Sequence, residues 1–106
     1  MTGMEQQGIR VEASARIVIR GMHIADNGRD VGGKGIGVYL HTREGVKTRE
    51  VTVRECVICD SGAGFQGEAF RDEGEANRFE NNTFSGSLVV PTTVVSGNTE
   101  VAACPG

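Results

Sequence analysis

The stretch Phe79-Glu80-Asn81-Asn82-Thr83-Phe84 decides the fold of this chain. Apolar residues stand at the first and sixth positions, a turn-like residue at the third and a residue that packs against its neighbours at the fourth. This six-residue pattern occurs three more times. It is found at residues 19–24 and 53–58 and, in degenerate form, at residues 95–100, where Val101 follows. Self-similarity of this kind is typical of repeat architectures, in which each unit is one small supersecondary element.

The third position of the pattern predicts a tight bend. It holds Gly21, Glu55, Asn81 and Gly97. Three of these four are residue types that tolerate a left-handed backbone. The fourth position holds Met22, Cys56, Asn82 and Asn98. We expect the asparagines to bond neighbouring backbone groups and the Met and Cys side chains to fill apolar gaps. Each unit is therefore predicted to be strand, bend, strand.

A fainter repeat precedes the bends. Gly35-Ile36-Gly37-Val38 is similar to Gly62-Ala63-Gly64-Phe65 at an offset of 27 residues, and Gly8-Ile9-Arg10-Val11 precedes Gly35 by the same interval. Strands that recur every two dozen residues or so predict a parallel β-solenoid. We assign one domain, residues 1–106, with coils at about 8–34, 35–61, 62–86 and 87–101.

Composition agrees with an all-β chain of one domain. Among the 106 residues there are 13 Val but two Leu, together with 16 Gly and two Pro. Val suits a pleated surface, whereas Leu is the better helix former. The net charge of −3 leads us to expect neither nucleic acid nor a membrane as partner. Residues 1–7 contain no apolar stretch like that of a signal peptide, and the sequence assigns no cellular location.

The apolar-x-Asn-Asn-x-apolar unit resembles the right-handed parallel β-helix repeat of the pectate-lyase-like superfamily, over residues 8–101. This resemblance implies a short, right-handed, single-stranded parallel β-helix of three to four coils. It also implies a module that binds or processes polysaccharide or, alternatively, a structural or assembly module such as a section of a tailspike or adhesin. So short a stack leaves strand edges uncovered, so we expect a fragment of a longer β-helix or end-to-end self-association rather than the alternative, a self-sufficient monomer.

Two polar segments follow the first strands of adjacent coils, at residues 41–47 and 68–75. We expect them to be loops that lie side by side, on the face where members of the resembled superfamily often bind glycans. A uronate chain there would use a basic residue as the catalytic base, and the candidates are Arg43, Lys47 and Arg71. The candidate substrate-binding residues are Tyr39, His41, Glu68 and Asp72. Two solvated loops without a ligand are the alternative. An enzyme of this kind would be a lyase or glycosidase that acts on an acidic glycan.

Cofactor chemistry finds little support in the sequence. Asp72, Glu73 and Glu75 form the nearest approach to a calcium site, but their spacing also fits an acidic loop, which we favour. Cys56 and Cys59 have the spacing of half a zinc site, and no second pair completes it. We therefore predict no metal and no cofactor. The three cysteines, Cys56, Cys59 and Cys104, are predicted to be buried thiols rather than metal or redox groups. Their odd, sparse count favours a reducing compartment or a protein indifferent to redox conditions.

Overall fold

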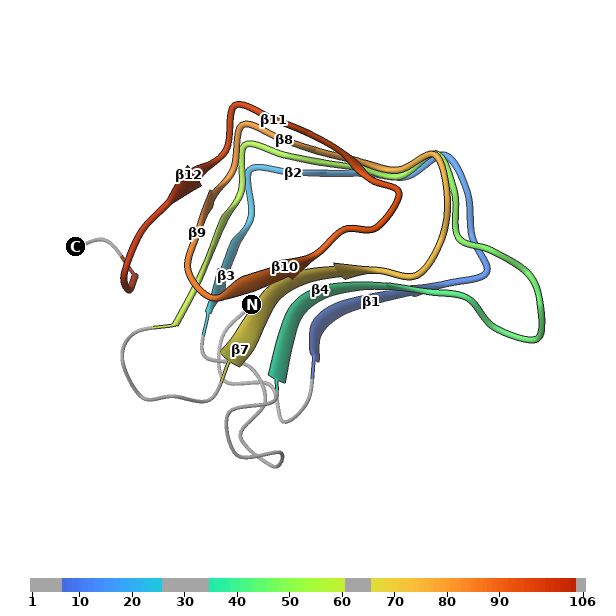
Figure 1. Ribbon diagram of the computed structural model, residues 1–106, viewed down its shortest axis with the longest axis horizontal. Helices are drawn as coiled ribbons and strands as arrows, with labels where there is room; N and C mark the ends of the chain where they lie inside the picture. The colour runs from blue at the N-terminus through green and yellow to red at the C-terminus, as the bar shows by residue number, and fades with distance from the viewer. Residues whose placement is uncertain (1–6, 26–34, 61–65, 105–106) are drawn as a thin grey trace.

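The computed structural model describes residues 7–25, 35–60 and 66–104, and all regular elements within these ranges are strands (Figure 1). The strands are β1 (Gln7–Glu12), β2 (Val18–Arg20), β3 (His23–Ala25), β4 (Gly35–His41), β5 (Thr52–Arg54), β6 (Val57–Cys59), β7 (Gln66–Asp72), β8 (Arg78–Glu80), β9 (Thr83–Phe84), β10 (Ser87–Val89), β11 (Val94–Ser96) and β12 (Thr99–Glu100). None of the described residues forms a helix that could cross a membrane.

The strands form three four-stranded parallel sheets. The first sheet is β1-β4-β7-β10, the second is β2-β5-β8-β11 and the third is β3-β6-β9-β12. Each coil contributes one strand to each sheet, so successive coils stack with the three sheets as walls around the core (Figure 1). The predicted short, right-handed parallel β-helix is confirmed, with about four coils.

The repeat predicted from the sequence fixes the register of the second sheet. Ile19 pairs with Val53, Val53 with Phe79, and Phe79 with Val95. The bend between the second and third sheets is confirmed in every coil, with positive φ at Gly21, Glu55, Asn81 and Gly97. We call this edge the Asn corner; it comprises residues 21–22, 55–56, 81–82 and 97–98.

Asparagine side chains stack along the Asn corner as expected. The Asn82 side-chain oxygen accepts the Cys56 amide at 2.9 Å, and its nitrogen donates to the Val53 carbonyl at 3.0 Å. Asn98 repeats this one coil later, with bonds to the Asn82 amide and the Phe79 carbonyl. The apolar gap-filling prediction holds for Cys56, which is buried, but it is wrong for Met22, which is 36% exposed because no described coil covers it.

The fainter repeat has a different register from the one predicted. Ile9 pairs with Val38 and Val38 with Phe70, so the true offsets are 38 − 9 = 29 and 70 − 38 = 32 residues, not 27. The strands align by their inward apolar side chains rather than by their glycines. The segment Gly62-Ala63-Gly64-Phe65 lies outside the described residues.

Aromatic and branched side chains fill the interior of the coils. The Phe70 and Phe79 rings stack with centroids 4.6 Å apart, and Phe84 meets Phe79 edge-on at 6.1 Å. Leu40 and Ile58 are fully buried with them. All five belong to one cluster that runs through the stack, so the walls of the helix share a single core.

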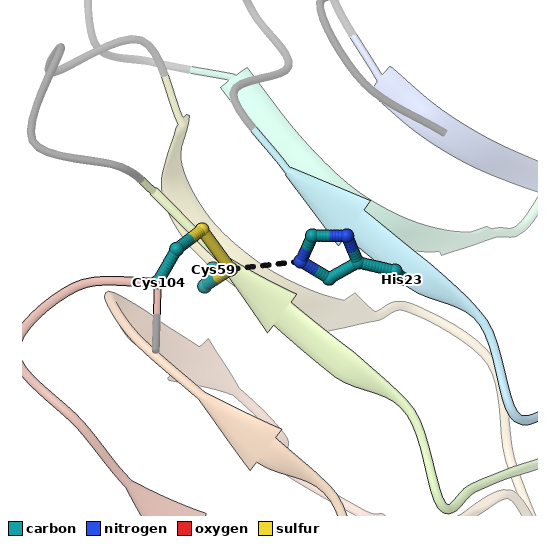
Figure 2. A group of neighbouring side chains, drawn as sticks. All are labelled: His23, Cys59 and Cys104. Carbon is teal, nitrogen blue, oxygen red and sulfur yellow. Dashed lines mark hydrogen bonds between the residues drawn. A yellow bond between two sulfur atoms is a disulfide. The ribbon is translucent and has the colours of Figure 1, made fainter. Parts of the chain in front are cut away.

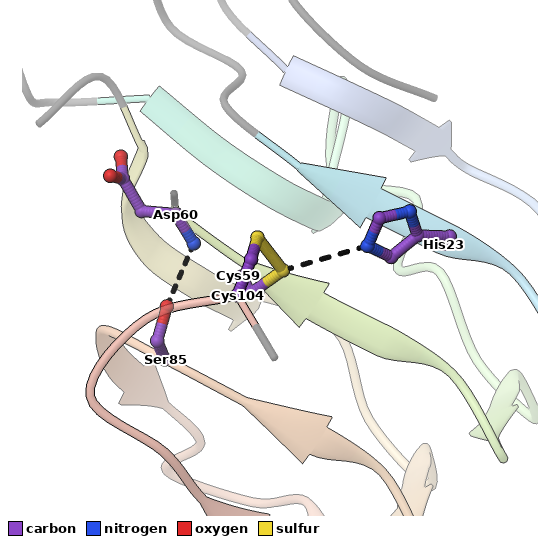
Figure 3. The surroundings of a disulfide bond; sticks show 5 residues. All are labelled: His23, Cys59, Asp60, Ser85 and Cys104. Atoms are coloured by element: carbon purple, nitrogen blue, oxygen red, sulfur yellow. Dashed lines mark hydrogen bonds between the residues drawn. A yellow bond between two sulfur atoms is a disulfide. The ribbon is translucent and has the colours of Figure 1, made fainter. Parts of the chain in front are cut away.

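The cysteine prediction is wrong for two of the three residues. Cys59 and Cys104 form a disulfide across a sequence separation of 45 residues. The segment after β12 brings Cys104 beside Cys59 of the third sheet (Figure 3). There the Cys104 amide donates to the Asp60 carbonyl at 2.8 Å. Spacing along the chain cannot reveal such a contact, because stacking of the coils creates it. Cys56 is a free, buried thiol, as predicted.

Candidate functional site

A polar cluster covers the outer face of the first sheet. Arg10, Tyr39 and Arg71 occupy neighbouring register positions on β1, β4 and β7. The Arg10 guanidinium carbon lies 5.5 Å from the centroid of the Tyr39 ring, which is within cation–π range. Because these strands alternate inward and outward side chains, stacking the coils puts the three outward residues in one row.

A second row lies at the ends of the same strands, where Glu12 pairs in register with His41. The Nδ1 atom of His41 is 2.8 Å from a carboxylate oxygen of Glu73, and the Tyr39 ring lies 5.0 Å from the His41 ring. Partial burial and a hydrogen bond to Glu73 raise the pKa of Tyr39 to about 12. Burial opposes ionisation of Glu73, but hydrogen bonds from Tyr39 and His41 outweigh it and lower the pKa of that carboxyl.

The arginines of this face are engaged with acids. Arg71 makes two hydrogen bonds of 2.7 Å to the Glu68 carboxylate, which raise the pKa of its guanidinium. Arg43 donates to Glu12 at 2.9 Å, and this bond lowers the Glu12 pKa. A guanidinium remains protonated in proteins, so arginines suit the binding of a carboxylate better than the removal of a proton.

The segment at residues 42–47 is a projecting turn, confirming a loop there. The Arg43 and Val46 backbones bond reciprocally at 2.9 and 3.1 Å, and Glu44 and Gly45 both have positive φ. Two successive positive φ angles are typical of a tight type I′ hairpin turn. This turn belongs to the longest of the four connections between the first and second sheets (Figure 1). We call the connections between those sheets, residues 13–17, 42–51, 73–77 and 90–93, the loop corner.

A groove of about 490 Å³ runs beside this turn and crosses three coils. It is lined by Ala13, Ser14, Ala15, Gly45, Val46, Lys47, Arg49 and Glu75. Within the described part of the chain, Lys47 and Arg49 make no side-chain ion pair, unlike the arginines of the outer face. The Ala13 amide bonds to the His41 carbonyl at 3.3 Å, so the groove adjoins the end of the polar cluster.

The predicted loop at residues 68–75 is mostly strand. Residues 66–72 form β7, and the adjacent Ala69 and Phe70 are both fully buried where the pairing with β10 is irregular. Glu68 and Arg71 flank this irregularity and pair with each other. The polar residues were therefore a poor guide to a loop, because a bulged strand also carries them.

Asp72 does not join the exposed cluster. It is 1% exposed, and its carboxylate accepts hydrogen bonds from the Gly74 amide, the Asn77 side chain and the Thr93 hydroxyl. It closes the loop corner and is unavailable to a substrate, so we leave it out of the site. Glu73 contacts His41, and Glu75 lines the groove, so the three acids do not converge as a group of metal ligands among the described residues.

Three residues of the face and the adjoining groove were not predicted from the sequence: Arg10, Glu12 and Arg49. The first two alternate with apolar Ile9 and Val11, and this period of two is the signal that could have found them. Arg49 had no such signal, because it lies in the long connection before β5 and reaches the groove only through the bridges to residues 15 and 75.

A separate group of side chains could hold a metal ion. The ligand atoms of His23, Cys59 and Cys104 all lie within 4.8 Å of one another (Figure 2). His23 and Cys59 belong to the third sheet and Cys104 follows β12, so this group lies on a different wall of the coil from the polar cluster.

Sheet topology defines this chain as a parallel β-helix repeat protein. A scan against protein-family models gives no match, and searches of curated proteins and of solved structures give none either.

Proposed function

We propose that this β-helix belongs with the pectate-lyase-like proteins and binds an acidic polysaccharide. The polymer would lie along the outer face of β1, β4 and β7 and continue into the groove at the loop corner. The observation that carries the proposal is the pair of cations in that groove, Lys47 and Arg49, which make no side-chain ion pair among the described residues although Glu75 lines the same groove. A uronate carboxylate would supply an acidic partner.

The arrangement fits a polymer better than a small molecule. The groove spans three coils, and the adjoining face offers the Tyr39 ring, against which a sugar could pack. Arg10 and Arg71 flank that ring by register. A chain of sugars that runs across the coils would thus meet alternating basic and aromatic groups.

Turnover by a lyase would place the base role on Lys47 in its neutral form and leave Arg49 to bind the uronate carboxylate. Arg43 and Arg71 are hydrogen-bonded to Glu12 and Glu68, whereas Lys47 is exposed in the groove. The reaction would remove the proton next to the uronate carboxylate and expel the neighbouring sugar, leaving an unsaturated uronate.

The test is a screen of the purified chain against pectins, alginates and bacterial capsular polysaccharides. Binding is measured by affinity electrophoresis and product release by mass spectrometry. We expect retardation by at least one acidic polymer, weakened about tenfold or more in the double variant Lys47→Ala/Arg49→Ala. Arg54→Ala removes an exposed cation from the outer face of the second sheet and serves as the matched control. Binding of no polymer, or equal loss in both variants, would refute the proposal.

A structural or assembly role is the second candidate, and the C-terminal end of the stack favours it. Val94 and Val95 are 50% and 47% exposed there, beside a hollow lined in part by Phe84 and Leu88. No described strand pairs with the outer edges of β10, β11 and β12. Under this proposal, light scattering shows oligomers whose size grows with protein concentration, and Val95→Glu dissociates them. A monomer at all concentrations would exclude the assembly role.

A further inference from the structure

The His23 ring is directed at the Cys59–Cys104 disulfide, with Nε2 3.8 Å from the Cys59 sulfur (Figure 2). We propose that reduction of this disulfide creates a zinc site whose ligands are His23, Cys59 and Cys104. The oxidised chain then has no such site, since both sulfurs are bonded to each other. The disulfide would act as a switch that decides whether the chain holds the metal.

The distances suit tetrahedral zinc. With Zn–S bonds of about 2.3 Å and Zn–N bonds of about 2.0–2.1 Å, a ligand nitrogen and sulfur lie about 3.6 Å apart and two sulfurs about 3.8 Å. The separation between His23 and Cys59 is already close to the first value. After reduction the Cys104 sulfur must move away from that of Cys59, and Cys104 lies outside any strand, where its segment can adjust.

The scaffold that holds the ligands does not depend on the disulfide alone. His23 and Cys59 stand on β3 and β6, which pair in parallel, with Ala25 opposite Cys59. The segment that carries Cys104 is bonded to the stack through the Cys104 amide and through the Val101 amide, which donates to the Phe84 carbonyl at 2.7 Å. Ligands placed by backbone pairing are ready for a metal without a large rearrangement.

The chemistry balances with a dithiol as reductant. The dithiol gives two electrons and two protons to the disulfide, becomes a disulfide itself and leaves the Cys59 and Cys104 thiols. Zinc binding then releases both thiol protons and takes the neutral imidazole of His23 as third ligand. Three protein ligands leave a fourth position for water or an exogenous ligand. Cys56 stays outside the site, because its thiol is buried and faces the Ile19 and Arg54 carbonyls.

The test titrates the full chain with Co²⁺ and Zn²⁺ after reduction with a phosphine, which does not bind these metals strongly. We expect one metal per chain, a thiolate-to-cobalt charge-transfer band, the visible spectrum of tetrahedral cobalt, and release of two protons. His23→Ala should weaken zinc binding by at least about tenfold, because even the loss of an outer-shell partner costs that much. His41→Ala, which removes the other histidine, is the matched control and should bind as the parent does.

Several outcomes overturn the proposal. They are absence of binding by the reduced chain, equal affinity in the parent and His23→Ala, or equal binding by the oxidised chain. Circular dichroism of each reduced protein shows whether it is folded. If the reduced chain unfolds, zinc must refold the parent but not His23→Ala, and failure to do so also overturns the site. Polysaccharide binding is measured on the oxidised chain, so the two proposals fail independently.

Discussion

The Asn corner and the loop corner connect strands of the same coils, yet they are built in opposite ways. At the Asn corner, two residues separate the strands in every coil, between Arg20 and His23 and at the three equivalent places. At the loop corner, the connections contain 5, 10, 5 and 4 residues, because they run from residues 12 to 18, 41 to 52, 72 to 78 and 89 to 94. One edge of the helix keeps its length fixed, and the other accepts insertions.

The reason lies in how each edge satisfies its polar groups. Asn82 is 1% exposed and bonds backbone groups of the preceding coil, so an insertion there would leave those groups buried without partners. The turn at residues 42–47 projects into solvent, where water supplies partners for the backbone. The neighbouring ion pair of Arg43 with Glu12 lies at the surface and therefore contributes little to stability. We therefore expect stability to depend on the Asn corner side and binding to depend on the loop corner side.

The largest expected effect is loss of the disulfide beside the third sheet. Cys104→Ser should lower the free energy of unfolding by about 4 kcal/mol, because a bridge across 45 residues restricts the unfolded chain strongly. Urea denaturation without reductant and with a chelator measures it. The control Cys56→Ser keeps a hydrogen-bonding group at the free, buried cysteine and should cost about 1 kcal/mol. Equal denaturation midpoints for Cys104→Ser and the parent would contradict the prediction.

The next largest effect tests the Asn corner itself. Asn82→Leu leaves the Cys56 amide and the Val53 carbonyl without side-chain partners, so it should cost about 3 kcal/mol. The matched control is Asn81→Gly, an exposed neighbour with φ of 54°, where glycine is compatible with the backbone. That change should stay within about 1 kcal/mol. A neutral Asn82→Leu would refute the stacked-asparagine account of this edge.

The sequence predicts the structure well at the Asn corner and poorly at the loop corner. The Asn corner was predictable because each repeat has two connecting residues, so the register of Ile19, Val53, Phe79 and Val95 follows directly from aligning the motif. Even Glu55, an unexpected residue type for a left-handed bend, was correctly placed there by its column. At this edge the residue preferences of the motif and the stacking of the coils favour the same structure.

The loop corner and the cysteines were not predictable in the same way. Variable connections hide the register of the first sheet, so the glycine match gave an offset of 27 residues in place of 29 and 32. Asp72 looked like a solvent-facing acid because its neighbours are charged, but Asn77 and Thr93 hold it inside the corner. The contact between Cys59 and Cys104 arises only when the chain returns past the third sheet. Each of these features depends on residues from different coils.

On the loop corner side, the pH titration of Tyr39 tests the contacts of the polar cluster more directly than a measurement of stability does. Tyr39 is the only Tyr in a chain without Trp, so tyrosinate absorbance reports it alone. We expect a midpoint at pH about 12 because burial and Glu73 disfavour the phenolate. Since the folded-state pKa exceeds the unfolded value of 10.0, the stability contributed by Tyr39 is complete below pH 10 and is lost as the pH rises toward 12.

The variant Glu73→Gln separates the two causes of that shift. Removing the Glu73 carboxylate should lower the pH midpoint of Tyr39, and the part of the shift that burial causes should remain. The control Glu75→Gln, which changes an acid in the groove, should leave the Tyr39 midpoint unchanged. Glu73 itself has a lowered pKa, so its contribution to stability is present above pH 4.5 and is lost as the pH falls below that value. A Tyr39 midpoint near 10 in the folded parent would contradict the contact between Tyr39 and Glu73.

The smallest expected effect has the opposite sign and returns to the Asn corner. Glu55 occupies a left-handed position with φ of 54°, where its Cβ costs about 1–2 kcal/mol, whereas Gly21 and Gly97 avoid that strain in other coils. Glycine also raises the entropy of the unfolded chain, which offsets about 0.5–1 kcal/mol. Glu55→Gly should therefore stabilise the protein by about 0.5–1 kcal/mol, since the ion pairs of Glu55 with Arg20 and Arg54 are exposed and weak. The control Arg54→Gly, one residue earlier inside β5, should destabilise the protein. A loss of stability in both variants would contradict the claim that the left-handed backbone at residue 55 favours glycine.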